Sequence, residues 1–258
     1  MRFVLRCLAM SGVAAALVSP TTASASARLE SKPTGPIIVS AAASLIEAFT
    51  RIGEQFERKY DGTDVTFNFD ASSALVLQIR SGAPADVFAS ANEASMDELV
   101  DDEHVSAKPV VFARNELMIA TKAGNPERIR TLADLADAGT IALCAAAAPC
   151  GKYADTALAA TGVSIPLERI TRGVNAKATL TAVSEGDADA AIVYVTDVKA
   201  AGKSVRGVAI PDSDNQIARY PIAPVAERSN TKTAKAFVEY VSSAKGQKVL
   251  RMEGFLAP

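Results

Sequence analysis

The sequence is poor in the residues that most often build catalytic and metal sites. Its 258 residues include one histidine, His104, which lies in the charged run DDEHV, a pattern typical of a solvated surface. A zinc site is therefore disfavoured. A serine hydrolase would lack its usual base, and no G-x-S-x-G segment occurs. A serine–lysine pair stays open as the catalytic alternative, but we expect no enzyme.

The chain also lacks an excess of positive charge. It has 27 Lys and Arg against 29 Asp and Glu, and hydrophobic residues make up 49% of it. This composition predicts a globular protein rather than a disordered one, and it disfavours a nucleic-acid-binding surface. The length suffices for one large domain or two modest lobes.

Residues 1–27 lack a run long enough to span a bilayer and instead predict an export signal. Arg2 and Arg6 are followed by an apolar stretch from Leu8 to Val18, and the small-residue segment TTASASA suits cleavage before Arg28. A stretch of about eleven residues is too short for a membrane span. We expect a periplasmic or other extracytoplasmic protein, and this location together with the lack of a helix-turn-helix segment argues against a transcription regulator.

Removal of the signal would change both the cysteines and the charge. Cys7 lies ahead of the apolar stretch, so it is no lipidation site and leaves with the signal. Without the two signal arginines, 25 Lys and Arg face 29 Asp and Glu, a net charge of −4. Any bound anion must then be attracted by local groups. Of three cysteines, Cys144 and Cys150 remain, and they either pair in the oxidising compartment or stay free, because disulfide geometry is strict.

Strand-like and helix-like segments alternate after a linker over residues 28–36. The run IIVS precedes a helix predicted from Ser44 to Tyr60, whose apolar residues recur at helical spacing. DVTFNF and ADVFAS indicate further strands, and the same rhythm resumes between TLADLADAG and VRGVAI. It predicts an α/β fold with mainly parallel sheets flanked by helices.

Two extended segments interrupt this rhythm, Pro109–Gly124 and Asn215–Glu227. The first is too long for one ordinary strand and is interrupted by Arg114 and Asn115. They flank a separate α/β series, which predicts two lobes joined by two crossing segments. We place lobe 1 at residues 37–114 plus 220–258 and lobe 2 at 115–219. Ligands of two-lobed proteins bind in the cleft between the lobes.

Four turns between a strand and a helix carry small, mostly uncharged residues: SAAASL, DASSAL, APCGKY and GVNAKA. Helix N-termini at such turns offer free N–H groups and a partial positive charge, which suits a small anion. There are simpler interpretations. Ser44 with Glu47 matches a capping box, Ser72 and Ser73 could be ordinary caps, and Tyr194 could be a core residue.

The segments AAASL, QIRSGAPADVFASA, AIVYVTD, RYPIAPV and the closing GF resemble, in order and spacing, the molybdate-binding proteins of bacterial ABC importers. The resemblance covers nearly the whole mature chain and implies the two-lobed type II periplasmic-binding-protein fold. Two serine hydroxyls, backbone N–H groups and one tyrosine hydroxyl hold the oxyanion in that family. The residues that match here are Ser44, Ser72, Cys150, Ala176 and Tyr194, with Ser73 as an additional candidate.

The resemblance implies that the protein captures molybdate, and tungstate as well, and delivers it to the permease subunits of an ABC importer. It implies a monomer without a cofactor, with molybdenum present only as the bound oxyanion. A receptor for sulfate, thiosulfate or another tetrahedral oxyanion is the alternative. If Cys150 contributes only its N–H, its thiol is free to pair with Cys144. Asp70 would have to point away from an anion, whereas Lys152 and Lys177 near two helix starts either assist it or face solvent.

Overall fold

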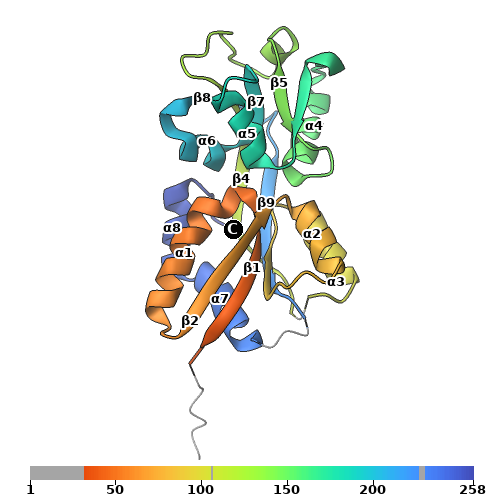
Figure 1. Ribbon diagram of the computed structural model, residues 1–258. Helices are drawn as coiled ribbons and strands as arrows, with labels where there is room; N and C mark the ends of the chain where they lie inside the picture. Colours follow the sequence, from red (N-terminus) through yellow and green to blue (C-terminus); the bar gives the residue numbers. More distant parts are fainter. Residues whose placement is uncertain (1–31, 106, 227–229) are drawn as a thin grey trace, which may run out of the picture. The chain divides into compact units, whose positions relative to one another are not determined.

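The computed structural model describes residues 32–105, 107–226 and 230–258 (Figure 1). The expected signal over residues 1–27 and Cys7 lie outside the described residues. Residues 32–258 form one compact unit. None of the helices in its described part is both long and apolar enough to cross a membrane.

In the described residues, nine strands form a mixed sheet in the order β2-β1-β3-β9-β4-β7-β5-β6, and β8 pairs with β4 beside this path. The strands are β1 (Gly35–Ala42), β2 (Thr63–Asp70), β3 (Val87–Ala89), β4 (Val110–Lys122), β5 (Ile141–Cys144), β6 (Ile170–Gly173), β7 (Ala190–Tyr194), β8 (Val205–Ala209) and β9 (Ile217–Pro224). The sheet starts two residues earlier than predicted, because Gly35 already pairs with Thr63 of β2.

Eight α-helices are present in the described residues; seven of them pack on the strands in two groups, and the last packs on other helices. They are α1 (Ile46–Lys59), α2 (Ser72–Arg80), α3 (Glu93–Asp101), α4 (Pro149–Thr161), α5 (Ala176–Ser184), α6 (Val195–Ala201), α7 (Thr231–Ser242) and α8 (Ala244–Glu253). Helices α1, α2, α3 and α7 contact β1, β2 and β9, whereas α4, α5 and α6 contact β4, β5, β7 and β8. Figure 1 shows β4 and β9 running between the two groups.

The pairing of parallel strands determines where the loops that follow these strands lie. β1 is parallel to both β2 and β3, and β5 is parallel to both β6 and β7. Because parallel strands end at the same edge of a sheet, three loops meet at one edge of each parallel set. The strands that join the two sets, β4 and β9, are antiparallel to their neighbours, so the sheet is mixed.

β4 is one strand of 13 residues, so the expectation that it is too long and interrupted at Arg114 and Asn115 was wrong. Its first part pairs with β9 up to Glu116, and its second part pairs with β7 and β8 from Leu117 onward. The strand can be this long because each part has its own partners. Arg114 and Asn115 pair with β9 without a break, and the one irregularity lies between Val111 and Ala113.

The core beneath α1 forms as the apolar spacing predicts. Phe49, Ile52 and Phe56 are fully buried, and the two phenylalanine rings contact Phe237 of α7 edge-on. Such aromatic pairs add to the apolar area that folding buries. This packing fixes α1 on the sheet and, with it, the short 3₁₀ turn Ala43–Leu45 that connects β1 to α1.

Candidate functional site

A small pocket lies where the two sets of parallel strands end. Six loops or strand ends line it, following β1, β2 and β3 on one side and β5, β6 and β7 on the other. Its lining residues are Ala42, Ala43, Ser44, Asp70, Ala71, Ser72, Ala91, Ala148, Pro149, Cys150, Asn175, Ala176 and Tyr194. The pocket thus occupies the position at the carboxyl ends of strands where α/β proteins bind ligands.

The pocket is small and its walls are short. The cavity volume is about 10 Å³. This is far below the roughly 300–1,000 Å³ of pockets for drug-sized ligands. Alanine supplies six of the lining residues, so the backbone comes close to the space. The pocket therefore fits a small ion rather than a sugar or a nucleotide.

All five residues that the sequence singled out line this pocket. Ser44, Ser72, Cys150, Ala176 and Tyr194 come together from five separate loops or strand ends, and each is at least 95% buried. Ser73, the additional candidate, is not among the lining residues and is half-buried on α2.

Ser72 is set up to donate its hydroxyl proton. Its Oγ accepts a hydrogen bond from the N–H of Ala91 in the loop after β3, at 2.9 Å. A donor already occupies the oxygen in this way, so the Ser72 O–H remains available to donate to another partner. Ser72 is also the first residue of α2, where backbone N–H groups lack partners within the helix.

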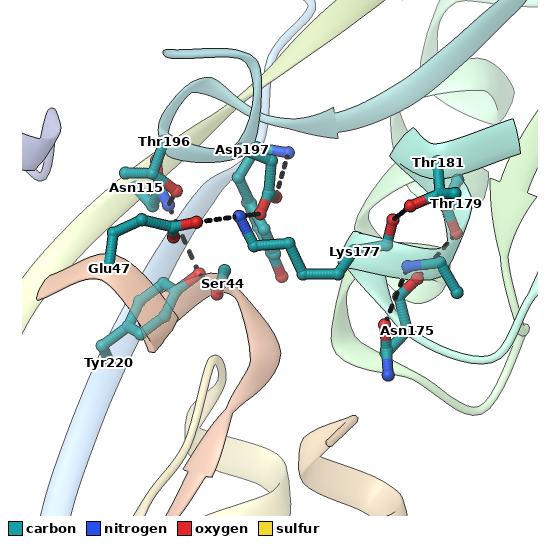
Figure 2. Close-up of polar contacts among 12 residues, drawn as sticks. Ser44, Glu47, Asn115, Asn175, Lys177, Thr179, Thr181, Thr196, Asp197 and Tyr220 are labelled. Atoms are coloured by element: carbon teal, nitrogen blue, oxygen red, sulfur yellow. Dashed lines mark hydrogen bonds and ion pairs between the residues drawn. The ribbon is translucent and has the colours of Figure 1, made fainter. Parts of the chain in front are cut away.

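Ser44 is held by residues far away in the sequence, and the capping-box interpretation was wrong. Its Oγ lies 2.8 Å from the hydroxyl of Tyr220 on β9, and Asn115 of β4 donates to that same hydroxyl at 3.4 Å. Neither helix nor turn at this point has a side-chain cap. Ser44 lies inside the 3₁₀ turn Ala43–Leu45 and not at a cap position, and Glu47, the expected second member of the box, binds Lys177 (Figure 2).

The hydrogen bonds around Tyr220 have a consistent direction. The amide nitrogen of Asn115 can only donate, so the Tyr220 oxygen accepts and its O–H is left to donate to Ser44. The hydroxyl proton of Ser44 is then left for the pocket. Burial raises the pKa of Tyr220 well above its usual value, so this hydroxyl stays protonated.

Tyr194 presents a buried hydroxyl that has no hydrogen-bond partner within residues 32–105, 107–226 and 230–258. The residue ends β7, lines the pocket and is 1% exposed. Burial, together with the neighbouring Tyr220, Tyr153 and Asp197, raises the pKa of Tyr194 well above its usual value. It therefore stays a neutral donor. Buried polar groups are almost always paired, so this one points to a missing partner in the pocket.

Helices α4 and α5 also begin at the pocket. Cys150 is the second residue of α4, after Pro149, and Ala176 is the first residue of α5. The first N–H groups of a helix and its dipole both favour an anion. Gly151 lets α4 approach closely, because a Cβ at this position would lie 2.1 Å from the carbonyl oxygen of Ala145.

Cys144 and Cys150 form a disulfide, with their Cα atoms 5.8 Å apart. Cys144 ends β5 and Cys150 lies in the first turn of α4, so the bond ties the helix start to the strand. The Cys150 thiol is thereby consumed, and its backbone N–H is the group that remains for a ligand. The described residues contain no cluster of His, Cys, Asp and Glu suited to a metal ion.

Asp70 is among the residues that line the pocket. Its carboxylate is occupied: Oδ1 accepts from the N–H of Ala71 at 2.7 Å and from the amide of Asn175 at 3.1 Å, and Oδ2 accepts from Gln78 at 3.5 Å. These donors offset its charge. The bond to Asn175 also joins the end of β2 to the start of α5.

The two lysines near helix starts differ in their exposure and in their ion pairs. Lys152 of α4 is exposed to solvent. Lys177 of α5 lies between two acids, 2.6 Å from Oε1 of Glu47 and 3.8 Å from Oδ1 of Asp197 (Figure 2). Asp197 is fully buried in the first turn of α6, and burial raises its pKa to about 6.

Sequence reasoning missed Tyr220, Asn115 and Asp197. Tyr220 and Asp197 stand inside the segments RYPIAPV and AIVYVTD that carry the family resemblance, but neither pattern indicates a role. Asn115 was taken for a strand break. Its signal would have been a polar residue inside an apolar run, which in a buried strand needs a partner.

A larger hollow elsewhere is basic and contains none of the predicted residues. Arg51, Arg58, Lys59, Lys245 and Lys248 contribute to its lining. Arg51 pairs with Glu253, and Arg58 lies 3.8 Å from Glu54. These side chains lie on helices α1 and α8, away from the strand ends.

Comparisons with known proteins agree with this geometry. Residues 37–256 match the family described as bacterial extracellular solute-binding protein. The chain is 38% identical over 253 residues to the molybdate-binding protein ModA of Mycobacterium tuberculosis, covering 95% of this chain and 96% of that protein. The substrate-binding domain of a putative molybdenum ABC transporter from Clostridium difficile has a TM-score of 0.66 at 27% identity, covering 87% of this chain and all of that one.

The sulfate-binding protein SubI of Mycobacterium tuberculosis has a TM-score of 0.77 at 20% identity, covering 86% of each chain, which at this identity shows a shared fold alone. The family match over residues 37–256, and the similarity to ModA over nearly the full length of both chains, decide the classification. The chain belongs to the bacterial extracellular solute-binding protein family.

Proposed function

We propose that the protein captures molybdate, and tungstate as well, in the pocket at the strand ends and delivers it to the permease of an ABC importer. The observation that carries this proposal is the hydroxyl of Tyr194, which is buried, has no partner among the described residues and lines a pocket together with the donors Ser44 and Ser72. The ModA protein that is 38% identical is by name a molybdate-binding protein, which supports the choice of ligand.

The proposed ligand contacts are the hydroxyls of Ser44, Ser72 and Tyr194 and the backbone N–H groups of Cys150 and Ala176. Together they could replace the hydration of a dianion without a neutralising lysine or arginine in the lining. Asp70 is the one acid in the lining, and its oxygens already accept hydrogen bonds.

The lobe boundaries belong to the same proposal. Lobe 1 would comprise residues 37–114 and 220–258, and lobe 2 residues 115–219. An anion bound to Ser44 and Ser72 on one side and to Tyr194 on the other would then hold the lobes together. The crossing segments would be β4 and β9, which pair with each other. A monomer suffices, because one chain supplies every proposed contact.

Selectivity would follow from the donors. A fully deprotonated tetrahedral dianion can accept a hydrogen bond on every oxygen. Protonated phosphate would bring an O–H whose possible acceptor, Asp70, is already occupied, and an unpaired buried polar group is costly. Sulfate differs from molybdate in size alone, so a sulfate receptor is the second candidate, in keeping with the fold shared with SubI.

Calorimetric titration of the purified mature protein with molybdate, tungstate, sulfate and phosphate tests the proposal. We expect tight one-to-one binding of molybdate and tungstate, and little heat with sulfate or phosphate. Ser73→Ala is the matched control for Ser72→Ala, since both serines lie in the first turn of α2 but Ser72 alone lines the pocket. Binding of sulfate without molybdate would overturn the named ligand, and equal losses in both variants would overturn the role of Ser72.

A further inference from the structure

A buried acid supports the backbone of Tyr194 at the point where β7 passes into α6. Oδ2 of Asp197 accepts a hydrogen bond from the N–H of Tyr194 at 3.2 Å. The carboxyl group is completely buried, and its other oxygen, Oδ1, has no hydrogen-bond partner in the described parts of the chain. Asp197 therefore positions Tyr194, but it places a negative charge behind the pocket wall.

Lys177 is the cation that faces this acid. Its Nζ lies 3.8 Å from Oδ1 of Asp197 and 2.6 Å from Oε1 of Glu47 on α1, and Figure 2 shows the three side chains in a row beside Ser44. Lys177 directly follows Ala176 at the start of α5, so it is adjacent to the pocket without lining it.

Without Lys177, the two acids in this row would repel an anion in the pocket. A dianion beside a buried carboxylate is repelled strongly, because charges interact over several ångströms where water is excluded. A cation on the same carboxylate removes most of that repulsion. The remaining groups that face Asp197 carry no positive charge: Glu47 is an acid, and the hydroxyls of Tyr194 and Tyr220 are neutral.

We propose that Lys177 is a positioning residue for oxyanion binding: its ammonium is the counter-charge that lets Asp197 hold the backbone of Tyr194 without repelling the bound dianion. This inference rests on the proposed function of the pocket. It gives Lys177 a role through Asp197, and not through contact with the ligand.

Variants that remove or keep the charges of Lys177 and Asp197 test this proposal through their affinity for molybdate. We expect Lys177→Met to weaken molybdate binding about tenfold or more, because it leaves an uncompensated carboxylate near the dianion. Asp197→Asn keeps an oxygen for the Tyr194 N–H and removes the charge, so the double variant Lys177→Met/Asp197→Asn should return to within about threefold of the wild type. Lys177→Arg should keep most of the affinity. Lys152→Met is the control, because Lys152 lies in the first turn of α4 and is exposed.

A second variant separates the counter-charge from a purely mechanical link between α1 and α5. If Lys177 acted only by bridging to Glu47, then Glu47→Gln would weaken binding as much as Lys177→Met. The counter-charge role predicts that Glu47→Gln binds molybdate as well as the wild type or better, because an acid is lost and Lys177 remains beside Asp197. Equal losses in Glu47→Gln and Lys177→Met, or no rescue by Asp197→Asn, would overturn the inference.

Urea unfolding without ligand tests the counter-charge role of Lys177 separately from the proposed function of the pocket. Lys177 lowers the pKa of Asp197, which burial raises. Lys177→Met should therefore lose more stability to urea at pH 8, where Asp197 is charged, than at pH 5, and Asp197→Asn should abolish that difference. If the wild type bound no oxyanion, the proposed function would fail and this comparison would still decide the counter-charge. Equal losses at both pH values would contradict it.

Discussion

The hydroxyl of Tyr194 is a buried donor without an acceptor among the described residues, an arrangement that folded proteins normally avoid. A ligand oxygen would satisfy it. Tyr194→Phe should then weaken molybdate binding by about 2 kcal/mol, roughly thirtyfold, the scale of a hydrogen bond to a charged group. Titration calorimetry measures this loss.

The same variant should leave the ligand-free protein as stable as the wild type, because no protein hydrogen bond is removed. Thermal unfolding without ligand is the control. An unchanged affinity combined with lower stability would assign Tyr194 to the core and not to the ligand.

Tyr220 affects molybdate binding indirectly, because its hydroxyl orients the hydroxyl of Ser44. Tyr220→Phe removes the donor to Ser44, so the Ser44 proton is no longer directed to the pocket. We expect molybdate affinity to fall by about 1 kcal/mol, the net value of a typical hydrogen bond. Ser44→Ala should cost at least as much, and combining the two should add little, because both act through one hydroxyl. Additive losses in a double-mutant cycle would show that Tyr220 acts by another route.

Asp197 makes the stability of the protein depend on pH. Burial raises its folded-state pKa from the usual 3.8 to about 6, so between these values the folded protein holds a proton that the unfolded chain has released. Stability from this group therefore falls as pH rises from about 4 to about 6, by up to roughly 3 kcal/mol. In urea unfolding, Asp197→Asn should raise the free energy of unfolding relative to the wild type by more at pH 7 than at pH 4. An equal effect at the two pH values would contradict the assignment.

At the scale of elements, the disulfide between Cys144 and Cys150 joins the end of β5 to the start of α4, and its closed loop is short. Loop closure of this size stabilises by about 2 kcal/mol in the chain-entropy account. We expect Cys144→Ser/Cys150→Ser to lower the urea midpoint accordingly and to weaken molybdate binding, because the first turn of α4 is less fixed. Unchanged affinity would mean that the disulfide is not needed to hold the first turn of α4 for the ligand.

The start of α4 also depends on Gly151. In most helices Gly→Ala is stabilising. Here the added Cβ would lie 2.1 Å from the carbonyl oxygen of Ala145, so Gly151→Ala should destabilise the fold by about 1–3 kcal/mol. Chemical denaturation measures the loss, with Lys152→Ala on the exposed side of the same turn as the control. A stabilised Gly151→Ala variant would refute the close approach.

The sequence predicted most elements but misjudged those whose polar residues find distant partners. β4 was expected to break at Arg114 and Asn115, whereas the Arg114 backbone pairs with Leu256 and the Asn115 side chain binds Thr196. Ser44 looked like a helix cap because it stands three residues before Glu47. Tertiary contacts with Tyr220 and Lys177 replaced that local bond, and local spacing carries no information about them.

At the scale of the molecule, the convergence of the predicted turns on one pocket was predictable and the network that supports the pocket was not. Parallel strands bring their carboxyl ends to one edge, so turns such as SAAASL and APCGKY had to converge once the α/β rhythm was recognised. The residues that orient them could not be read from the sequence in this way. Ser44 and Tyr220 are 176 positions apart, and Asp197 lies behind a segment that reads as ordinary core.

The mature chain has an expected net charge of −4, so attraction by overall charge does not explain the binding of a dianion. In the proposed site, attraction would come from oriented groups inside the pocket, which dissolved ions screen poorly. We expect the molybdate dissociation constant to change by no more than about twofold between 50 and 500 mM sodium chloride. A dissociation constant that rises steeply with salt would indicate an exposed site, such as the basic hollow around Arg58 and Lys248.

The central claim is that molybdate binds in the pocket at the strand ends. A crystal structure of the protein grown with molybdate tests it most directly, because anomalous scattering from molybdenum locates the ion. The account predicts a single molybdenum peak in the pocket at the strand ends, with its oxygens within hydrogen-bonding distance of Ser44, Ser72 and Tyr194. A peak among Arg51, Lys245 and Lys248 instead, with none at the strand ends, would contradict the account.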